Sequence, residues 1–160
     1  MGRLESMAAE IGAVLKGRQQ TIAVFESSTG GLVSAALLAV PGASRYYLGG
    51  GVIYTQQARH ALARLGEEDM RGLRSSSEPY AQLLAGQARH IFGADWGIAE
   101  TGAAGPDGNR YGDAPGHSCL AVSGTIDAAE TLETGGSNRE INMRRFAEAA
   151  LDLMHRTLAL

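Results

Sequence analysis

The sequence predicts an α/β fold, a layered α/β/α single domain over residues 1–160 with a mixed sheet. In the first two thirds of the chain, short apolar segments alternate with helical patterns, which is typical of parallel strands joined by helices. Two strand patterns then follow each other directly, which indicates an antiparallel pair. A chain of this length commonly forms one domain and buries roughly 70% of its unfolded surface.

The first five elements follow from periodicity and from the positions of glycine and proline. Apolar side chains at helical spacing open the chain, and Pro41 ends the second helix because proline cannot continue it. Aromatic and β-branched residues around three glycines indicate a strand with a close backbone approach. The expected elements are a helix over residues 4–16, a strand over 21–26, a helix over 29–39, a strand over 46–54 and a helix over 56–65.

The second half begins with a clear helix start at Ser77-Glu78-Pro79, since serine caps a helix and proline fits its first turn. A glycine-rich stretch over residues 102–116 reads as a loop, and loops of that length in a compact domain are usually functional. The expected elements are a short helix over residues 67–73, a helix over 79–92, strands over 96–101, 117–123 and 127–134, and a helix over 138–157.

The composition excludes several classes of function. A net charge of −3 and a pI near 5.8 provide no general basic surface for nucleic acid. No window of 18 apolar residues predicts a membrane span, and the start of the chain lacks the apolar core of a secretory signal. The single cysteine, Cys119, can form neither an intrachain disulfide nor a thiolate cluster. We therefore expect a cytoplasmic protein without a metal site.

The run Phe25–Gly31 places hydroxyl groups and glycines where the first strand gives way to a helix. Open α/β sheets place their chemistry at such junctions. The unpaired N–H groups of a helix start also attract anions such as phosphate. A simpler interpretation is that Ser28 or Thr29 only caps the helix.

Polar side chains follow three predicted strands, at Ser27, Tyr54 and Thr101, and such strand ends can converge on one crevice. These residues belong to motifs whose order and spacing resemble those of the CinA C-terminal domain family, whose enzymes are nicotinamide mononucleotide deamidases. The motifs are Glu26-Ser27-Ser28-Thr29-Gly30-Gly31, Pro41-Gly42-Ala43-Ser44, Gly49-Gly50-Gly51-Val52-Ile53-Tyr54, Ser77-Glu78-Pro79, Thr101-Gly102-Ala103-Ala104-Gly105-Pro106-Asp107-Gly108 and Gly136-Ser137-Asn138-Arg139.

This resemblance implies a homo-oligomeric amidohydrolase that converts the carboxamide of a small nucleotide to a carboxylate and ammonia, with no metal or cofactor. Carried over by position, Ser27 is the nucleophile and Tyr54 a hydrogen-bonding partner near it. Within the pocket, glycine N–H groups would serve a developing oxyanion, and Arg139 a phosphate. The expected substrate contacts are Thr29, Gly30, Gly31, Ser44, Thr101, Gly102 and Arg139.

Arg59 is the most consequential departure from the family, which has a lysine at this position. A lysine can lose its proton and act as a base, whereas arginine stays protonated. Arg59 can therefore hold an anion or polarise an oxygen at the catalytic centre, but it cannot take the Ser27 proton. General acid–base help is worth ~10²–10⁴ in rate. Ser28, in place of the family's cysteine, removes a thiol but not the expected nucleophile.

His117 replaces a threonine of the family and is a candidate substitute base, although a partly exposed strand histidine is the simpler interpretation. The other histidines lie on predicted helices without a second ligand at helical spacing.

Three functions are compatible with these observations. The first is a nicotinamide mononucleotide deamidase with a serine nucleophile. The second is a catalytically weakened family member that binds a nucleotide or a protein partner, and Arg59 motivates this alternative. The third is an amide hydrolase for another small substrate.

Overall fold

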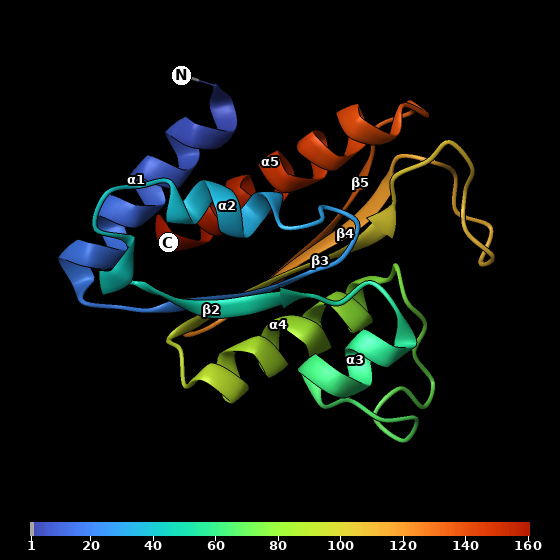
Figure 1. Cartoon of the computed structure of the whole chain (residues 1–160), viewed down its shortest axis with the longest axis horizontal. Helices are drawn as coiled ribbons and strands as arrows, with labels where there is room; N and C mark the ends of the chain where they lie inside the picture. The colour runs from blue at the N-terminus through green and yellow to red at the C-terminus, as the bar shows by residue number, and fades with distance from the viewer. Residues whose placement is uncertain (1) are drawn as a thin grey trace.

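The computed structural model describes residues 2–160 and shows one five-stranded sheet between two layers of helices (Figure 1). The strand order is β2-β1-β3-β4-β5. The first three strands run parallel, and the last two pair antiparallel at one side. The predicted mixed sheet is therefore confirmed. The strands are β1 (Ile22–Glu26), β2 (Tyr47–Val52), β3 (Trp96–Ala103), β4 (His117–Ser123) and β5 (Ala128–Glu133).

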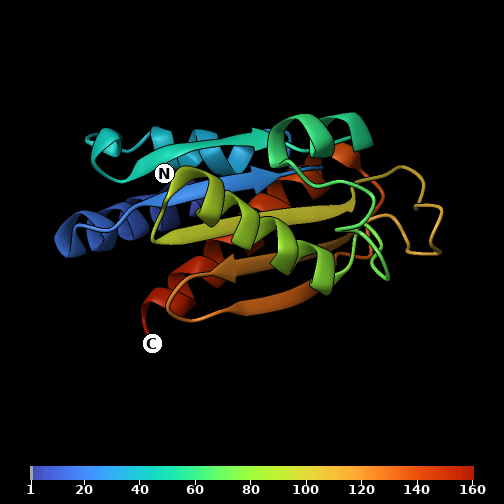
Figure 2. The same cartoon turned by 90° about the horizontal axis from the view of Figure 1, so that it is seen from below.

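The helices divide between the two faces of the sheet, as the predicted α/β/α layering requires. One core joins the sheet to three helices, and a second core lies under the other two. Figure 2 is seen from the side that α4 covers. The first face carries α1 (Arg3–Arg18), α2 (Leu32–Leu38) and α5 (Arg139–Leu158), and the second carries α3 (Gln56–Ala63) and α4 (Glu78–Phe92), while the short 3-10 helix η1 (Ala43–Arg45) precedes β2.

Strand β1 shows why the sheet is covered on both sides. All five of its residues are buried. Ile22 and Val24 pack into the first core, and Ala23 and Phe25 pack into the second. A parallel strand that is buried on both faces reads as a continuous apolar run, and this run ends only at Glu26.

The expected short helix over residues 67–73 is wrong, because this segment is a series of turns. Its backbone hydrogen bonds span three residues, as from Met70 N–H to the Glu67 carbonyl. The Asp69 side chain accepts from the N–H of Gly66, and such local bonds compete with a helix. Gly72, with φ of 78°, then closes the series.

The carboxyl ends of β1, β2 and β3 meet at one edge of the sheet, on the right in Figure 1. Phe25 pairs with Gly51 on one side and with Ala99 on the other. The parallel register therefore brings the segments after these strands together, as expected for Ser27, Tyr54 and Thr101. The loop over residues 104–116 extends from the same edge.

Candidate active site

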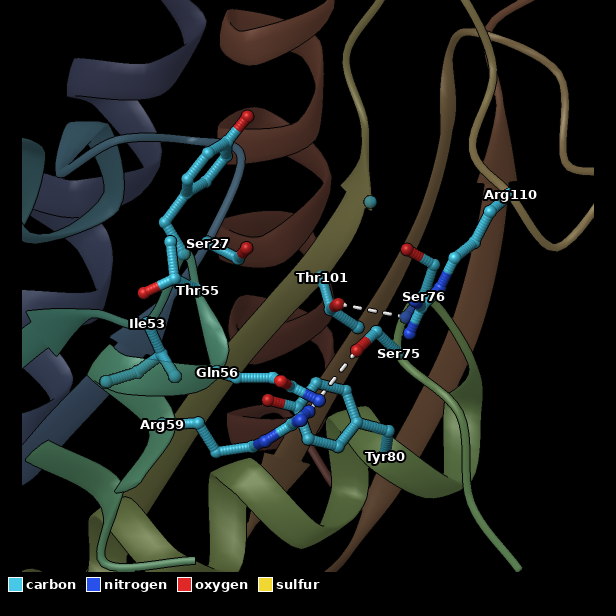
Figure 3. Close-up of a pocket in the computed structure, with 12 residues that line it drawn as sticks. Ser27, Ile53, Thr55, Gln56, Arg59, Ser75, Ser76, Tyr80, Thr101 and Arg110 are labelled. Atoms are coloured by element: carbon cyan, nitrogen blue, oxygen red, sulfur yellow. Dashed lines mark hydrogen bonds between the residues drawn. The ribbon is translucent and has the colours of Figure 1, made fainter. Parts of the chain in front are cut away.

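A cleft of about 320 Å³ lies at this edge and is here named the arginine cleft. Arg59 from α3 and Arg110 from the long loop both line it, and no carboxylate does. Figure 3 shows these side chains around the opening. Most of the other lining residues carry hydroxyl groups, namely Ser27, Tyr54, Thr55, Ser75, Ser76, Tyr80 and Thr101.

The two guanidinium groups are held by neutral partners. Arg59 donates to the Ser75 hydroxyl at 3.3 Å and lies 5.4 Å from the centroid of the Tyr80 ring. Arg110 donates to the Tyr111 hydroxyl at 3.0 Å. Within residues 2–160, neither arginine forms an ion pair with a carboxylate. Their positive charges are therefore available to an anionic ligand.

Ser27 opens into this cleft without a base in contact with it. Its main-chain N–H donates to Glu100, but its hydroxyl forms no hydrogen bond with any described residue. Arg59 extends toward Ser75 and Tyr80 in Figure 3, not toward Ser27. The Ser27 hydroxyl is accessible, but no described residue places a proton acceptor within hydrogen-bonding distance of it.

The start of α2 already holds an anion, which is the side chain of Glu26. This carboxylate accepts hydrogen bonds from the N–H groups of Gly31, Val33 and Ser34 at 2.9–3.1 Å. Gly30 N–H donates to the Ser27 carbonyl. The N–H groups of Gly30 and Gly31 are thus not free donors, contrary to the sequence-based expectation, because Glu26 and the turn occupy them.

Thr29 is fully buried, and its hydroxyl bridges two carboxyl groups. Its Oγ1 lies 2.6 Å from Glu26 Oε1 and 3.0 Å from Glu100 Oε1. Thr29 lines neither the arginine cleft nor the cavity described below, and so does not offer its side chain to a substrate there. Its role in this structure is to fix the loop between β1 and α2.

Glu100 is a fully buried carboxyl group on β3 beneath the same loop. Its Oε1 accepts from the N–H groups of Ser27 and Thr29, and its Oε2 lies 2.5 Å from Ser28 Oγ and 3.1 Å from Ser118 Oγ. Burial raises the pKa of Glu100 above its usual range, and the hydrogen bonds from Ser28, Thr29 and Ser27 oppose that rise only in part.

A second cavity of about 190 Å³ adjoins the first and is here named the glycine-loop cavity. It is lined by the Gly102–Asn109 loop together with Ser28, Tyr54 and Arg139. Tyr54 is 59% exposed, and its hydroxyl accepts from Arg139 Nη2 at 3.0 Å. Tyr54 and Gly102 line both cavities, so these two residues lie on their shared border.

Thr101 and Gly102, both expected to contact substrate, line the arginine cleft. The Thr101 hydroxyl accepts from Ser76 N–H at 3.1 Å and so holds the segment before α4 at the cleft. Gly102 is required by a close approach of β3 to β4, because a Cβ at this position would lie 2.5 Å from the His117 carbonyl oxygen. Arg139 also donates to the Gly105 carbonyl at 2.6 Å.

The structure does not bring Ser44 to the pocket of Ser27. Ser44 lies in η1, before the amino end of β2, whereas Ser27 follows the carboxyl end of β1. Since β1 and β2 are parallel, the two serines lie at opposite edges of the sheet. At ~3.3 Å per residue, a six-residue strand separates them by roughly 20 Å.

His117 is buried, not partly exposed. Its Nε2 lies 2.8 Å from the Ser76 carbonyl oxygen and 3.5 Å from Asp113 Oδ2, and its Nδ1 contacts Glu133. Burial alone would lower the pKa of His117, but the hydrogen bonds to Glu133 and to the Ser76 carbonyl outweigh it and raise the pKa. Its ring contacts no lining hydroxyl, which leaves the proposed substitute base without a nucleophile.

Sequence reasoning missed Glu100 and Arg110. Glu100 lies in the apolar strand run Ile98-Ala99-Glu100, and a carboxyl group in a strand that is buried on both faces requires several internal partners. The position of this glutamate within a buried strand was therefore the signal in the sequence that pointed to Glu100. Arg110 belongs to an irregular loop, whose path no sequence periodicity describes.

The chain matches the family model described as "CinA C-terminal domain" over residues 4–158. It belongs to the CinA C-terminal domain family. A CinA-like protein from Desulfosudis oleivorans is 35% identical over 155 residues, which cover 96% of this chain and 37% of that protein. Another, from Prochlorococcus marinus, is 39% identical over 120 residues, or 75% of this chain and 28% of the relative. The matched segments thus span 37% and 28% of the length of these two curated relatives.

Solved structures of CinA proteins share the fold. The competence/damage inducible protein CihA from Agrobacterium tumefaciens aligns with a TM-score of 0.91 and 25% identity, covering 100% of this chain and 98% of that one. A CinA superfamily protein from Klebsiella pneumoniae aligns with a TM-score of 0.90 and 23% identity, covering 98% of each chain. The layered α/β architecture is therefore that of the CinA superfamily.

Within residues 2–160, no helix has the length and apolar character needed to cross a membrane. No group of three or more His, Cys, Asp or Glu side chains in the same residues is arranged to hold a metal ion.

Proposed function

We propose that this CinA-family chain is an amidohydrolase that converts nicotinamide mononucleotide to nicotinate mononucleotide and ammonia, with a serine of the Glu26–Gly31 segment as nucleophile. The observation that carries the proposal is the arginine cleft. It combines an accessible serine hydroxyl with two guanidinium groups that no carboxylate neutralises. A mononucleotide needs both features, since its phosphate is anionic and its carboxamide is a poor electrophile.

By position in the family, Ser27 is the first candidate for the nucleophile. Arg59 and Arg110 would hold the phosphate, and Tyr54, which borders both cavities, would contact the pyridine ring or the ribose. An arginine side chain at this position suits phosphate binding but not the role of a base.

The test is ammonia release from nicotinamide mononucleotide, with the second product separated by chromatography. The reference is the double variant Ser27→Ala/Ser28→Ala, which removes both hydroxyl groups of the loop. We expect release by the natural protein well above that of the double variant. Equal release from the two proteins contradicts the proposal.

A binding protein is the second candidate, and the lack of a base at the Ser27 hydroxyl favours it. The substitution Arg59→Lys separates the two candidates, because a lysine restores a group that can lose its proton. Activity that appears only in Arg59→Lys supports a binding function for the natural chain. Activity in the natural chain excludes a purely binding role.

A further inference from the structure

The two adjacent serines of the loop differ in what their hydroxyl groups contact. Ser27 Oγ has no partner among the described residues, whereas Ser28 Oγ lies 2.5 Å from Glu100 Oε2. A general base has to lie within hydrogen-bond reach of the proton that it removes. Of the two serines, only Ser28 meets this condition.

Ser28 also faces a cavity. It is 5% exposed, and it lines the glycine-loop cavity with Arg139 and the loop that follows β3. In that loop, the main-chain N–H groups of Gly105, Asp107 and Gly108 donate to no acceptor in residues 2–160. Unpaired N–H groups beside a nucleophile are the donors that a tetrahedral oxyanion requires.

The sizes of the two cavities fit a substrate whose two parts occupy separate cavities. At about 190 Å³ the glycine-loop cavity is smaller than the ~300 Å³ typical of sites for drug-sized ligands, so it would take one ring and its amide. The arginine cleft, which meets it at Tyr54 and Gly102, is larger and carries Arg59 and Arg110 for a phosphate. A nucleotide that extends across this border would present its carboxamide to Ser28.

We propose that Ser28 is the nucleophile of this chain and that Glu100 is its general base. The proposal rests on the proposed amide hydrolysis and names the residues that perform it. Glu100 suits the role by position, because its Oε2 lies within hydrogen-bond reach of the Ser28 hydroxyl and its Oε1 is held by the N–H groups of Ser27 and Thr29.

In the acylation step, Glu100 Oε2 takes the Ser28 hydroxyl proton as Oγ bonds to the amide carbon. The tetrahedral intermediate then collapses, the C–N bond breaks, and Glu100 gives the proton to the departing nitrogen, which leaves as ammonia. In the second step Glu100 takes a proton from water, whose oxygen attacks the ester carbon. The Oγ–C bond breaks, and the proton returns to Ser28. The sum is amide plus water to carboxylic acid plus ammonia.

Ser118 provides a matched control. Its hydroxyl donates to the same oxygen, Glu100 Oε2, at 3.1 Å, but it lines neither of the two cavities. If the Ser28 hydroxyl only supported Glu100, removing the Ser118 hydroxyl would have a comparable effect. If Ser28 attacks the substrate, the two alanine variants differ greatly in rate.

The first experiment measures ammonia release by Ser27→Ala, Ser28→Ala and Ser118→Ala, with thermal unfolding as a check on folding. We expect Ser28→Ala to lose at least ~10³-fold in kcat, since it removes the nucleophile. Ser27→Ala and Ser118→Ala should each lose far less activity than Ser28→Ala. Loss in Ser27→Ala with full activity in Ser28→Ala overturns the proposal.

The second experiment needs no variant of Ser28. The natural protein is treated with a fluorophosphonate, whose phosphorus bonds to an activated serine oxygen as fluoride leaves, and the modified residue is located by tandem mass spectrometry. We expect the adduct on Ser28, retained in Ser27→Ala and absent in Glu100→Gln. An adduct on Ser27, or no adduct, overturns the proposal.

The two experiments distinguish failure of the proposed substrate from failure of the proposed Ser28–Glu100 pair. A natural protein that labels at Ser28 but releases no ammonia from the nucleotide contradicts the proposed substrate and supports the Ser28–Glu100 pair. A protein that releases ammonia but labels at Ser27 contradicts the pair and leaves the proposed function standing. If both Ser27→Ala and Ser28→Ala lose activity, the residue that carries the fluorophosphonate adduct identifies the nucleophile.

Discussion

Ser27 and Ser28 share one loop yet belong to two different regions of the edge of the sheet. The arginine cleft beside Ser27 is cationic and rich in hydroxyl groups, and none of its lining residues is a carboxylate. Ser28, which lines the glycine-loop cavity, contacts the buried carboxyl group of Glu100. In the proposed mechanism, the first region holds the anionic part of the substrate and the second transfers the proton. The two serines that line these regions are adjacent in the chain.

Both regions depend on carboxyl groups that never reach the surface. Glu26 fixes the start of α2, and Glu100 fixes the loop from below. Thr29 connects the two. Because these contacts set the direction of both serine side chains, the loop is organised by the protein itself before any ligand arrives.

The largest effect should come from Glu26→Ala. The change leaves the N–H groups of Gly31, Val33 and Ser34 without their acceptor. An unsatisfied buried group costs about 1–3 kcal/mol, so we expect the free energy of unfolding to fall by roughly 3–5 kcal/mol. Urea denaturation measures it. The exposed control Glu67→Ala should stay within about 0.5 kcal/mol. A similar result for both variants would show that the loop does not rely on Glu26.

Arg59→Ala tests whether the arginine cleft binds the anionic part of the substrate. Hydrogen bonds to charged groups are worth about 1.5–3 kcal/mol, which corresponds to a KM roughly 10- to 100-fold higher. We expect kcat to change little, because Arg59 does not contact either serine hydroxyl in this structure. Arg45→Ala, at the opposite edge of the sheet, controls for net charge. A fall in kcat with constant KM would instead assign Arg59 to the chemical step.

The sequence predicted the fold well because its signals were local. The start of α4 at Ser77-Glu78-Pro79 is an example, since the Ser77 side chain does accept from Tyr80 N–H. The helix predicted over residues 67–73 was wrong because the residue types of this segment are also typical of a helix. Within these seven residues, the sequence alone does not distinguish a helix from a series of turns. The deciding contact is the hydrogen bond from Gly66 N–H to the Asp69 side chain.

The site was harder to predict, because its decisive contacts join residues far apart in the chain. The resemblance to the family named Ser27, Tyr54, Thr101 and Arg139, and these four residues line the two cavities. It also placed Ser44 in the pocket, although motif order does not say at which end of a strand a residue lies. Glu100 reaches Ser28 across two neighbouring strands, and sequence periodicity carries no information about such a pairing.

His117 contacts the carbonyl of Ser76, a lining residue of the arginine cleft, and should make stability depend on pH. Its ring faces Glu133, Asp113, the Ser76 carbonyl and the Cys119 thiol. The pKa of His117 is raised in the folded protein. Its contribution to stability is therefore complete below the unfolded pKa of about 6.5 and is lost as the pH rises through the folded value.

The corresponding measurement compares the natural protein with His117→Gln in urea at several pH values from 6 to 9, a range set by the ordinary histidine pKa of about 6.5. The difference in unfolding free energy should shrink as the pH rises. Groups other than His117 titrate in both proteins and largely cancel. A difference that stays constant would mean that the imidazole acts only through packing.

The smallest effect should be that of Ser27→Ala on stability, and it is the most direct test of the contrast between the two serines. The Ser27 hydroxyl has no partner within residues 2–160, so its removal should change the free energy of unfolding by less than about 0.5 kcal/mol. Ser28→Ala removes a hydrogen bond to a buried carboxyl group and should cost about 1.5–3 kcal/mol. Equal costs would mean that the Ser27 hydroxyl gains a partner in solution. The hydrogen bond from the Ser28 hydroxyl to Glu100 would then no longer separate the two serines.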